Sequence, residues 1–164
     1  MYKVAITGST GLVGSRVVEL LKDEFEFIEL THDRVDLTNK ESVTTALQDI
    51  NFDFVIHSAA YTNVDKAENE DKELAYKLNV EATKYILEVS QAKKAKFIYV
   101  STDFVFDGIV FPNYEDDVVN PINVYGKTKA EGEKVVGDQG MIVRPSFPYR
   151  AQFEKKKDFV HTLS

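Results

Sequence analysis

A chain of 164 residues with 43% hydrophobic and 29% charged residues has the size and composition of one globular domain, which excludes the collagen-like, disordered and membrane-protein classes. The formal charge of −7 argues against a nucleic-acid-binding protein, and no apolar run reaches the ~18 residues of a membrane span. The absence of cysteine excludes disulfides and thiolate metal sites. Because the N-terminus does not resemble a secretory signal, we expect a cytoplasmic protein.

Five apolar runs of strand length recur along the chain, and stretches with helical periodicity separate most of them. The expected strands are Val4–Ile6, Phe27–Leu30, Phe54–Ile56, Phe97–Val100 and Met141–Val143. Their hydrophobicity is continuous rather than alternating, which is typical of a parallel sheet covered on both faces. The sequence therefore predicts an α/β fold with a doubly wound, mostly parallel sheet of the Rossmann-like type, which binds ligands at the carboxyl ends of its strands.

Four helices are expected in the segments between these strands. An apolar stripe over residues 12–21 indicates the first, and Thr38-Asn39-Lys40-Glu41 is interpreted as a capping box that opens the second. A long helix is predicted from about Glu73 to Gln91, with its apolar residues directed toward the core. Another is predicted from Val124 to about Val136.

The segment from Gly8 to Gly14 places three glycines between the first strand and the first helix. Gly8 permits a tight turn, Gly11 leaves room for a pyrophosphate, and Gly14 lets the helix pack closely on the strand. The helix N-terminus would offer unpaired N–H groups and partial positive charge to that pyrophosphate. A glycine-rich turn without a ligand is the alternative, but the context favours dinucleotide binding. The residues assigned to it are Gly8, Thr10, Gly11, Leu12, Val13 and Gly14.

Asp36 follows Gly14 by 22 positions (36 − 14), close to where an acidic residue is expected at the adenosine end of a dinucleotide. We assign Asp36 and Leu37 to the adenine pocket, and the alternative is an aspartate that stabilises the turn before a helix. The segment 31–34, Thr-His-Asp-Arg, offers both an acid for a ribose and a base for a phosphate. Both NAD and NADP therefore stay open as cofactors.

Tyr125 and Lys129 form a Tyr-x-x-x-Lys pattern at the start of the last predicted helix, where residues four apart share a face. A phenol with a reference pKa of about 10 is a poor proton donor at neutral pH, and an adjacent ammonium would lower that pKa. We expect Tyr125 to give a proton to a carbonyl oxygen as hydride reaches its carbon. Lys129 would tune Tyr125 and hold the nicotinamide ribose, and Thr102 would donate to the same oxygen. A surface tyrosine beside an unrelated lysine is the alternative.

Several longer segments extend these patterns over nearly the whole chain: the glycine loop, His57–Glu68, Leu78–Val80, Ser101–Gly108 and Pro121–Lys129. Together they resemble the extended short-chain dehydrogenase/reductase family and, more narrowly, its dTDP-4-dehydrorhamnose reductases. The blocks Val-Asp-Lys-Ala-Glu and Ser-Thr-Asp-Phe-Val-Phe-Asp-Gly are far more specific than the glycine loop. They separate this branch from the sugar-nucleotide epimerases.

The resemblance implies reduction of a 4-keto-6-deoxy nucleotide sugar by NADPH or NADH, with Tyr125 as the acid. It implies cofactor contacts at Gly11, Leu12, Val13, Asp36, Leu37, Ala59, Ala60, Tyr61, Thr62, Tyr125 and Lys129, and sugar contacts at Val64, Thr102, Asp103, Phe104 and Phe147. Asn79 either supports the helix of Tyr125 or is a helix-surface residue. Some relatives bind magnesium through a glutamate early in the first helix. Arg16 occupies that region in this chain, so we expect no metal.

The chain departs from this family in length, because such reductases extend well beyond residue 164. We expect residues 1–150 to form the NAD(P)-binding domain and residues 151–164 to begin a truncated substrate-binding region, which a second copy or another chain would complete. No nucleic acid or membrane is expected as a partner. The alternative function is a non-catalytic NADP-binding regulatory module that resembles the regulatory subunit of methionine adenosyltransferase. Epimerase or dehydratase activity is a weaker alternative.

Overall fold

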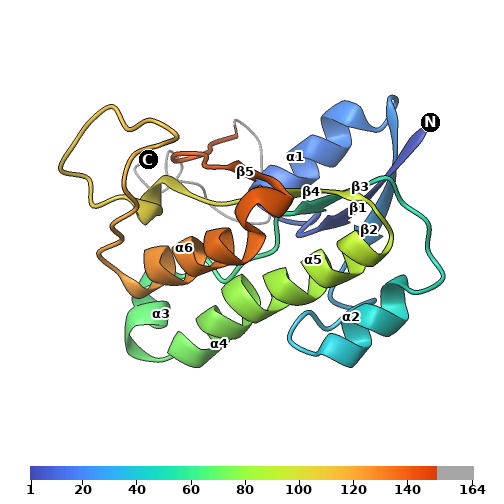
Figure 1. Cartoon of the computed structure of the whole chain (residues 1–164), viewed down its shortest axis with the longest axis horizontal. Coiled ribbons are helices and arrows are strands. Elements are labelled where there is room, and N and C mark those ends of the chain that lie inside the picture. The colour runs from blue at the N-terminus through green and yellow to red at the C-terminus, as the bar shows by residue number, and fades with distance from the viewer. Residues whose placement is uncertain (151–164) are drawn as a thin grey trace.

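Five parallel strands form the centre of the structure, a computed structural model that describes residues 1–150 (Figure 1). The strands are β1 (Tyr2–Thr7), β2 (Phe25–Leu30), β3 (Phe54–His57), β4 (Lys96–Val100) and β5 (Met141–Val143). Their order is β2-β1-β3-β4-β5, and every neighbouring pair is parallel. The doubly wound α/β prediction and the positions of the five predicted strands are confirmed. The predicted substrate-binding segment 151–164 lies outside the described residues.

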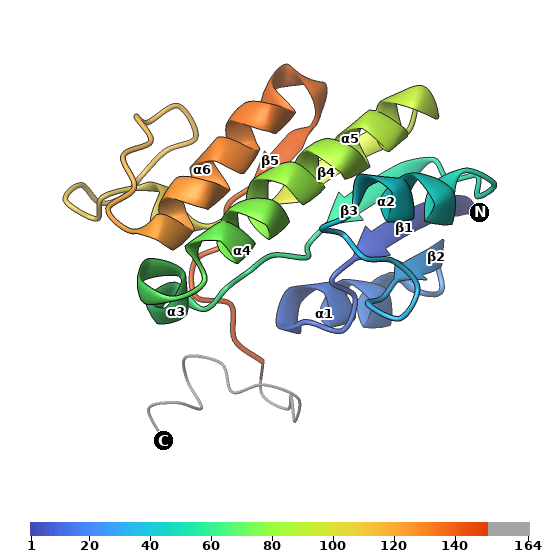
Figure 2. The same cartoon turned by 90° about the horizontal axis from the view of Figure 1, so that it is seen from below.

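Helices cover both faces of this sheet. The helix α1 (Leu12–Leu21) lies on one face, and α2 (Lys40–Leu47), α5 (Ala82–Ala92) and α6 (Val124–Val136) lie on the other (Figure 1, Figure 2). The short helices α3 (Val64–Asn69) and α4 (Lys72–Tyr76) precede α5, and short helical turns occupy Asp103–Val105 and Gly137–Gln139. Within residues 1–150, no helix has the length and apolar character that a membrane crossing requires.

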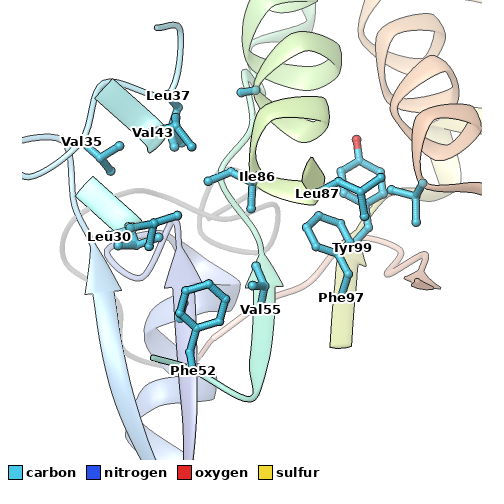
Figure 3. Packing of buried hydrophobic residues seen from close by; sticks show 14 residues of the cluster. Leu30, Val35, Leu37, Val43, Phe52, Val55, Ile86, Leu87, Phe97 and Tyr99 are labelled. Carbon is cyan, nitrogen blue, oxygen red and sulfur yellow. The ribbon is translucent and has the colours of Figure 1, made fainter. Parts of the chain in front are cut away.

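The hydrophobic core fills the space between the sheet and the helices α2 and α5 (Figure 3). Val55 and Phe97 from the strands pack there against Val43 and Ile86 from the helices. Full burial of an aliphatic or aromatic side chain of this size contributes about 1.5–3 kcal/mol. On the opposite face, Gly14 is the one buried residue of α1. The sheet is therefore anchored mainly from the α2–α5 side.

Two predicted helices differ from the structure in detail. The N-cap of α2 is Asn39, whose side chain accepts a hydrogen bond from the Ser42 amide at 3.0 Å. The capping box led by Thr38 is therefore wrong, because the Thr38 hydroxyl donates instead to Asp36 Oδ1 at 2.7 Å. The long helix predicted from about Glu73 to Gln91 is interrupted by a π-helical turn over Lys77–Glu81. Such turns are often found at functional sites.

The direction of the strand order changes between β1 and β3, where the chain leaves β1 for the outer strand β2 and then returns to the other side of β1. In folds of this type, the crevice at this point binds the ligand. The loops after β1 and β3 pack tightly there. A Cβ atom on Gly8, which has a φ of +68°, would lie 2.6 Å from the Ala59 nitrogen. Only glycine fits this turn.

Candidate active site

A cavity of about 510 Å³ lies at the carboxyl ends of the strands β1 to β4. Its lining includes the predicted residues Gly8, Thr10, Gly11, Leu12, Val13, Leu37, Ala59, Ala60, Thr62, Val64, Thr102, Asp103, Phe104, Tyr125, Lys129 and Phe147. Three predicted residues, Gly14, Asp36 and Tyr61, lie outside this lining. The structure thus brings the glycine loop and the Tyr-x-x-x-Lys pair to one cavity.

The glycine loop presents main-chain groups to the cavity. Gly11 is the N-cap of α1 and has no side-chain cap, and no acidic residue stands in the first turn of the helix. These free N–H groups and the partial positive charge of the helix end suit an anion. Gly14 lies behind the loop, where a Cβ atom would come within 2.2 Å of Gly8 O. Its predicted role in close packing is therefore confirmed. The buried Ser9 hydroxyl, which has no hydrogen-bond partner among the described residues, also faces this region.

Of the two residues assigned to the adenine pocket, Leu37 lines the cavity and Asp36 does not. Asp36 Oδ1 accepts hydrogen bonds from the amide and the hydroxyl of Thr38, and these bonds hold the pKa of the Asp36 carboxyl below its usual range. Asp36 thus stabilises the turn that leads into α2, and its contact with adenine stays a prediction. Leu37 lines the cavity together with Thr31 and His32 at the end of β2. Thr31 and His32 directly follow this strand, and that position could have identified them as cavity-lining residues.

Asn79, in the π-helical turn, connects the loop after β3 to the helix α6. It is 1% exposed, and its Oδ1 accepts a hydrogen bond from the Tyr61 amide at 2.8 Å. Its Nδ2 donates to Tyr61 O at 3.2 Å and to Thr128 Oγ1 at 2.9 Å. Of the two alternatives for Asn79, the helix-surface residue is excluded, and support of the α6 region agrees with these contacts.

The side chain of Tyr61 points to a carboxylate instead of the cavity. Its hydroxyl donates to Asp71 Oδ2 at 2.6 Å, and this hydrogen bond raises the pKa of Tyr61 to about 12. The main chain of Tyr61 is fixed by Asn79, as described above. A cofactor contact of Tyr61 stays a prediction.

A buried histidine behind the cavity fixes the position of the loop after β3. His57 Nδ1 lies 2.7 Å from Thr7 Oγ1, which also accepts a hydrogen bond from the Ala59 amide at 3.1 Å. Burial lowers the pKa of His57 to about 3, so the imidazole is neutral at pH 7. Neither Thr7 nor His57 was predicted to have a role. Thr7 and His57 are polar residues at the last positions of the neighbouring strands β1 and β3, and this pattern could have identified them.

Tyr125 at the start of α6 is 9% exposed and contacts the Phe104 ring edge-to-face, with the ring centroids 5.6 Å apart. Burial raises the pKa of the Tyr125 phenol, a hydrogen bond with Thr102 opposes that change, and the charge of Asp103 adds to it. The predicted lowering of this pKa by Lys129 is therefore wrong for the chain without ligand. Tyr125 is in its protonated form at neutral pH and can donate a proton.

Lys129 explains why that prediction failed. Its side chain is 1% exposed, its Nζ donates to Val100 O at 2.8 Å, and it lies 4.0 Å from the centroid of the Tyr99 ring. Burial lowers the pKa of Lys129 to about 7, although the nearby Glu133 carboxylate acts in the opposite direction. The amine is therefore only partly charged at neutral pH, which weakens its effect on Tyr125.

The remaining predicted sugar-contacting residues form a wall beside Tyr125. Thr102 Oγ1 donates to Asp103 Oδ1 at 3.2 Å, and Ser146 Oγ donates to Asp103 Oδ2 at 2.5 Å. The Phe104 ring lies 6.0 Å from the Phe147 ring, measured between centroids. This part of the cavity therefore combines an aromatic surface with an acceptor and a hydroxyl group, a combination that suits a sugar.

Metal binding has little support from the side chains described. Within residues 1–150, no three His, Asp or Glu residues cluster in a way that could hold an ion. Arg16 forms an ion pair with Glu19 at 2.6 Å on the exposed side of α1. The expected absence of a metal stays a prediction.

Comparisons with known proteins agree with this geometry. The dTDP-4-dehydrorhamnose reductase of Aggregatibacter actinomycetemcomitans is 36% identical over 99% of this chain and 56% of its own length. The methionine adenosyltransferase 2 subunit beta of Bos taurus is also 36% identical, over 82% of this chain and 42% of its own. The crystal structure of a dTDP-4-dehydrorhamnose reductase from Bacillus anthracis in complex with NADP superposes with a TM-score of 0.89 and 35% identity. That match covers 99% of this chain and 58% of the other.

The matches cover most of this chain but only part of each relative. It spans about half the length of the curated relatives it matches. The family model described as the RmlD substrate binding domain matches residues 2–164, which is nearly the whole chain. The chain therefore belongs to the RmlD substrate-binding domain family.

Proposed function

We propose that this chain carries the cofactor and proton-donor part of a reductase that uses NADPH to reduce a 4-keto-6-deoxy nucleotide sugar. The single observation that carries the proposal is the shared cavity. The uncapped N-terminus of α1 at Gly11 and the Tyr125–Lys129 pair line the same space of about 510 Å³. A dinucleotide that binds its pyrophosphate at one end would extend its nicotinamide toward the other.

The residues present fit such a cofactor. Gly8 and Gly14 have no room for a Cβ atom, Gly11 has little, and the buried Ser9 hydroxyl is left without a protein partner among the described residues. When bound, the reduced nicotinamide supplies a hydride. NADP is present in the Bacillus anthracis relative, and we extend it to this chain as the proposed cofactor.

The protein would act on the carbonyl oxygen of the sugar. Tyr125, which is protonated at neutral pH, would donate its phenolic proton to that oxygen as hydride reaches the carbon. The Thr102 hydroxyl would exchange its hydrogen bond to Asp103 Oδ1 for one to the same oxygen and stabilise the developing negative charge. Lys129 would contact the nicotinamide ribose, and Phe104 and Phe147 would hold the sugar ring in place.

The proposal is tested by adding NADPH or NADH and then a dTDP-4-keto-6-deoxy sugar, with the loss of reduced-nicotinamide absorbance as the readout. We expect NADPH binding and turnover, and we expect Tyr125→Phe to bind NADPH as tightly while it loses turnover by about 10²–10⁴-fold. Tyr114→Phe, on an exposed loop, is the matched control and leaves turnover unchanged. Full turnover by Tyr125→Phe would contradict the assignment of the acid.

A non-catalytic role in a larger assembly is the second candidate. The similarity to the methionine adenosyltransferase 2 subunit beta supports it, because that relative is named as a subunit. This candidate predicts NADP binding without turnover of any keto sugar, together with retention of a larger protein partner. Turnover in the assay above, or purification without any partner, excludes it.

A further inference from the structure

Arg144 reaches from the end of β5 back to helix α6 and forms a two-point ion pair with Glu133. Its Nε lies 2.9 Å from Glu133 Oε1, and its Nη2 lies 2.8 Å from Oε2. Glu133 is only 6% exposed, and charges in such surroundings interact more strongly than in water. Arg144 also donates to Glu115 O at 3.1 Å, and its guanidinium lies 5.2 Å from the centroid of the Phe106 ring. These contacts hold the guanidinium in one orientation.

Glu133 also acts on Lys129. The two residues are four positions apart on α6 and therefore share one face of the helix. The Glu133 carboxylate favours the charged form of Lys129, whereas burial favours the neutral amine. Both oxygens of Glu133 thus bind Arg144, while its charge also acts on Lys129.

The other groups around Lys129 carry no competing full charge. Tyr99 from β4 lies beneath the amine and, because burial raises its pKa, is protonated. His57 from β3 is neutral at pH 7, and Tyr125 from α6 is protonated. Glu133 is therefore the charged group that opposes the effect of burial on the pKa of Lys129.

We propose that Arg144 is a positioning residue that, by holding the Glu133 carboxylate in a two-point pair, limits how strongly this carboxylate stabilises the ammonium of Lys129. Arg144 thereby sets how much positive charge Lys129 presents to the cavity. The consequence for catalysis rests on the proposed function, because it concerns the charge next to Tyr125 and the cofactor. The coupling among the three side chains is independent of that function.

The two partners of the pair should act on Lys129 in opposite directions. Glu133→Gln removes the attraction and leaves the Arg144 charge in place, so the titration midpoint of Lys129 should fall by about one pH unit or more. Arg144→Gln leaves Glu133 free to attract Lys129, so the midpoint should rise by a similar amount. Arg144→Lys keeps the positive charge but loses the planar guanidinium that binds both oxygens of Glu133. In this variant the titration midpoint of Lys129 should lie between wild type and Arg144→Gln.

The experiment is an NMR pH titration of the whole 164-residue chain with isotope-labelled lysine. The Lys129 signal is assigned by its absence in Lys129→Met. Because Glu133→Gln leaves the half-buried Arg144 guanidinium without its carboxylate and is prone to unfold, the double variant Glu133→Gln/Arg144→Gln is measured beside it. This double variant replaces the charged pair by a neutral one, and its midpoint should lie between Glu133→Gln and wild type.

A purely structural role of the pair predicts a different result. Loosened packing would admit water to Lys129 and raise its midpoint in every variant. A rise in the double variant or in folded Glu133→Gln, or unchanged midpoints throughout, would overturn the proposal. NADPH titration of the same wild-type sample tests cofactor binding separately from the coupling among Arg144, Glu133 and Lys129. If NADPH does not bind but the midpoints move in opposite directions, the proposed function fails and the coupling stands.

Discussion

The two ends of the cavity are built in different ways. At the phosphate end, main-chain groups face the cavity, and their positions are set by glycines whose missing Cβ atoms allow contacts as close as those of Gly8 with Ala59. At the opposite end, Tyr125 and Lys129 present side chains whose charge depends on burial and on nearby charged groups, Asp103 for Tyr125 and Glu133 for Lys129. A backbone site can therefore be predicted from a short segment, whereas a side-chain site depends on how the whole chain packs around it.

The largest effect is expected from Gly8→Ala at the backbone end. Both the positive φ and the close approach of Ala59 oppose a Cβ atom there, so we expect loss of NADPH binding and a stability loss of more than about 3 kcal/mol. Gly108→Ala is the matched control, because Gly108 has a φ of +76° but no atom within 4 Å of the added Cβ. It should lose only about 1–2 kcal/mol and bind NADPH normally.

Chemical unfolding measures the stability loss of both variants, and NADPH titration measures their affinity for the cofactor. Equal losses in Gly8→Ala and Gly108→Ala would show that only backbone strain matters. The close packing of the two loops would then not be what shapes the phosphate end.

Asn79→Ala should have the next largest effect, because it removes the connection between the two ends. The Tyr61 amide and the Thr128 hydroxyl would lose a buried partner, at a cost of about 2–3 kcal/mol of unfolding free energy. Asn69→Ala removes a hydrogen bond from an exposed asparagine to Asp65 O and should cost less than about 1 kcal/mol. Similar losses in the two variants, measured by urea unfolding, would argue against Asn79 as a connecting residue.

The buried His57 predicts a pH dependence of stability. The pKa of His57 is about 3 in the folded chain and 6.5 for an unperturbed histidine, so between these values only the unfolded chain holds the proton. Stability should therefore fall as the pH drops below 6.5, by about 1.4 kcal/mol per pH unit from this group. His57→Gln should remove this contribution to the dependence of stability on pH. His32→Gln, at an exposed position, is the control. Parallel stability–pH curves for His57→Gln and wild type would contradict the burial of a neutral imidazole.

The smallest effect is expected from Tyr61→Phe. The variant loses the hydrogen bond to Asp71, which lies outside the cavity, at a cost of about 1 kcal/mol or less. NADPH affinity should stay within about twofold of wild type. A tenfold loss of affinity would instead place the Tyr61 side chain against the cofactor.

Residues with local signals were predicted well. The continuous apolar strands and the glycine loop were located because each depends on neighbours in the sequence. The N-cap at Asn39 was misplaced by one residue because Thr38 and Asn39 are both good caps, and the competing bond to Asp36 decides between them. The π-helical turn at Lys77–Glu81 has no distinctive composition and was missed.

The charge state of the side-chain end could not be predicted from the sequence. Spacing placed Tyr125 and Lys129 on one face of a helix, but it did not reveal that both side chains are almost fully buried. Burial reverses the expected change in the pKa of Tyr125 and brings that of Lys129 to about 7. The ion pair between Arg144, which directly follows β5, and Glu133 on α6 depends on how these two elements pack, so helical spacing does not predict it.

An NMR titration with NADPH most directly tests whether one ligand spans both ends of the cavity. The amides of Gly11 and Leu12 and the signals of Tyr125 and Lys129 should all shift along one saturable curve. ADP, which carries adenosine and a diphosphate but no nicotinamide, should shift the glycine-loop amides and leave the signals of Tyr125 and Lys129 unchanged. A titration in which NADPH moves the glycine loop but leaves Tyr125 and Lys129 unchanged would contradict a shared site.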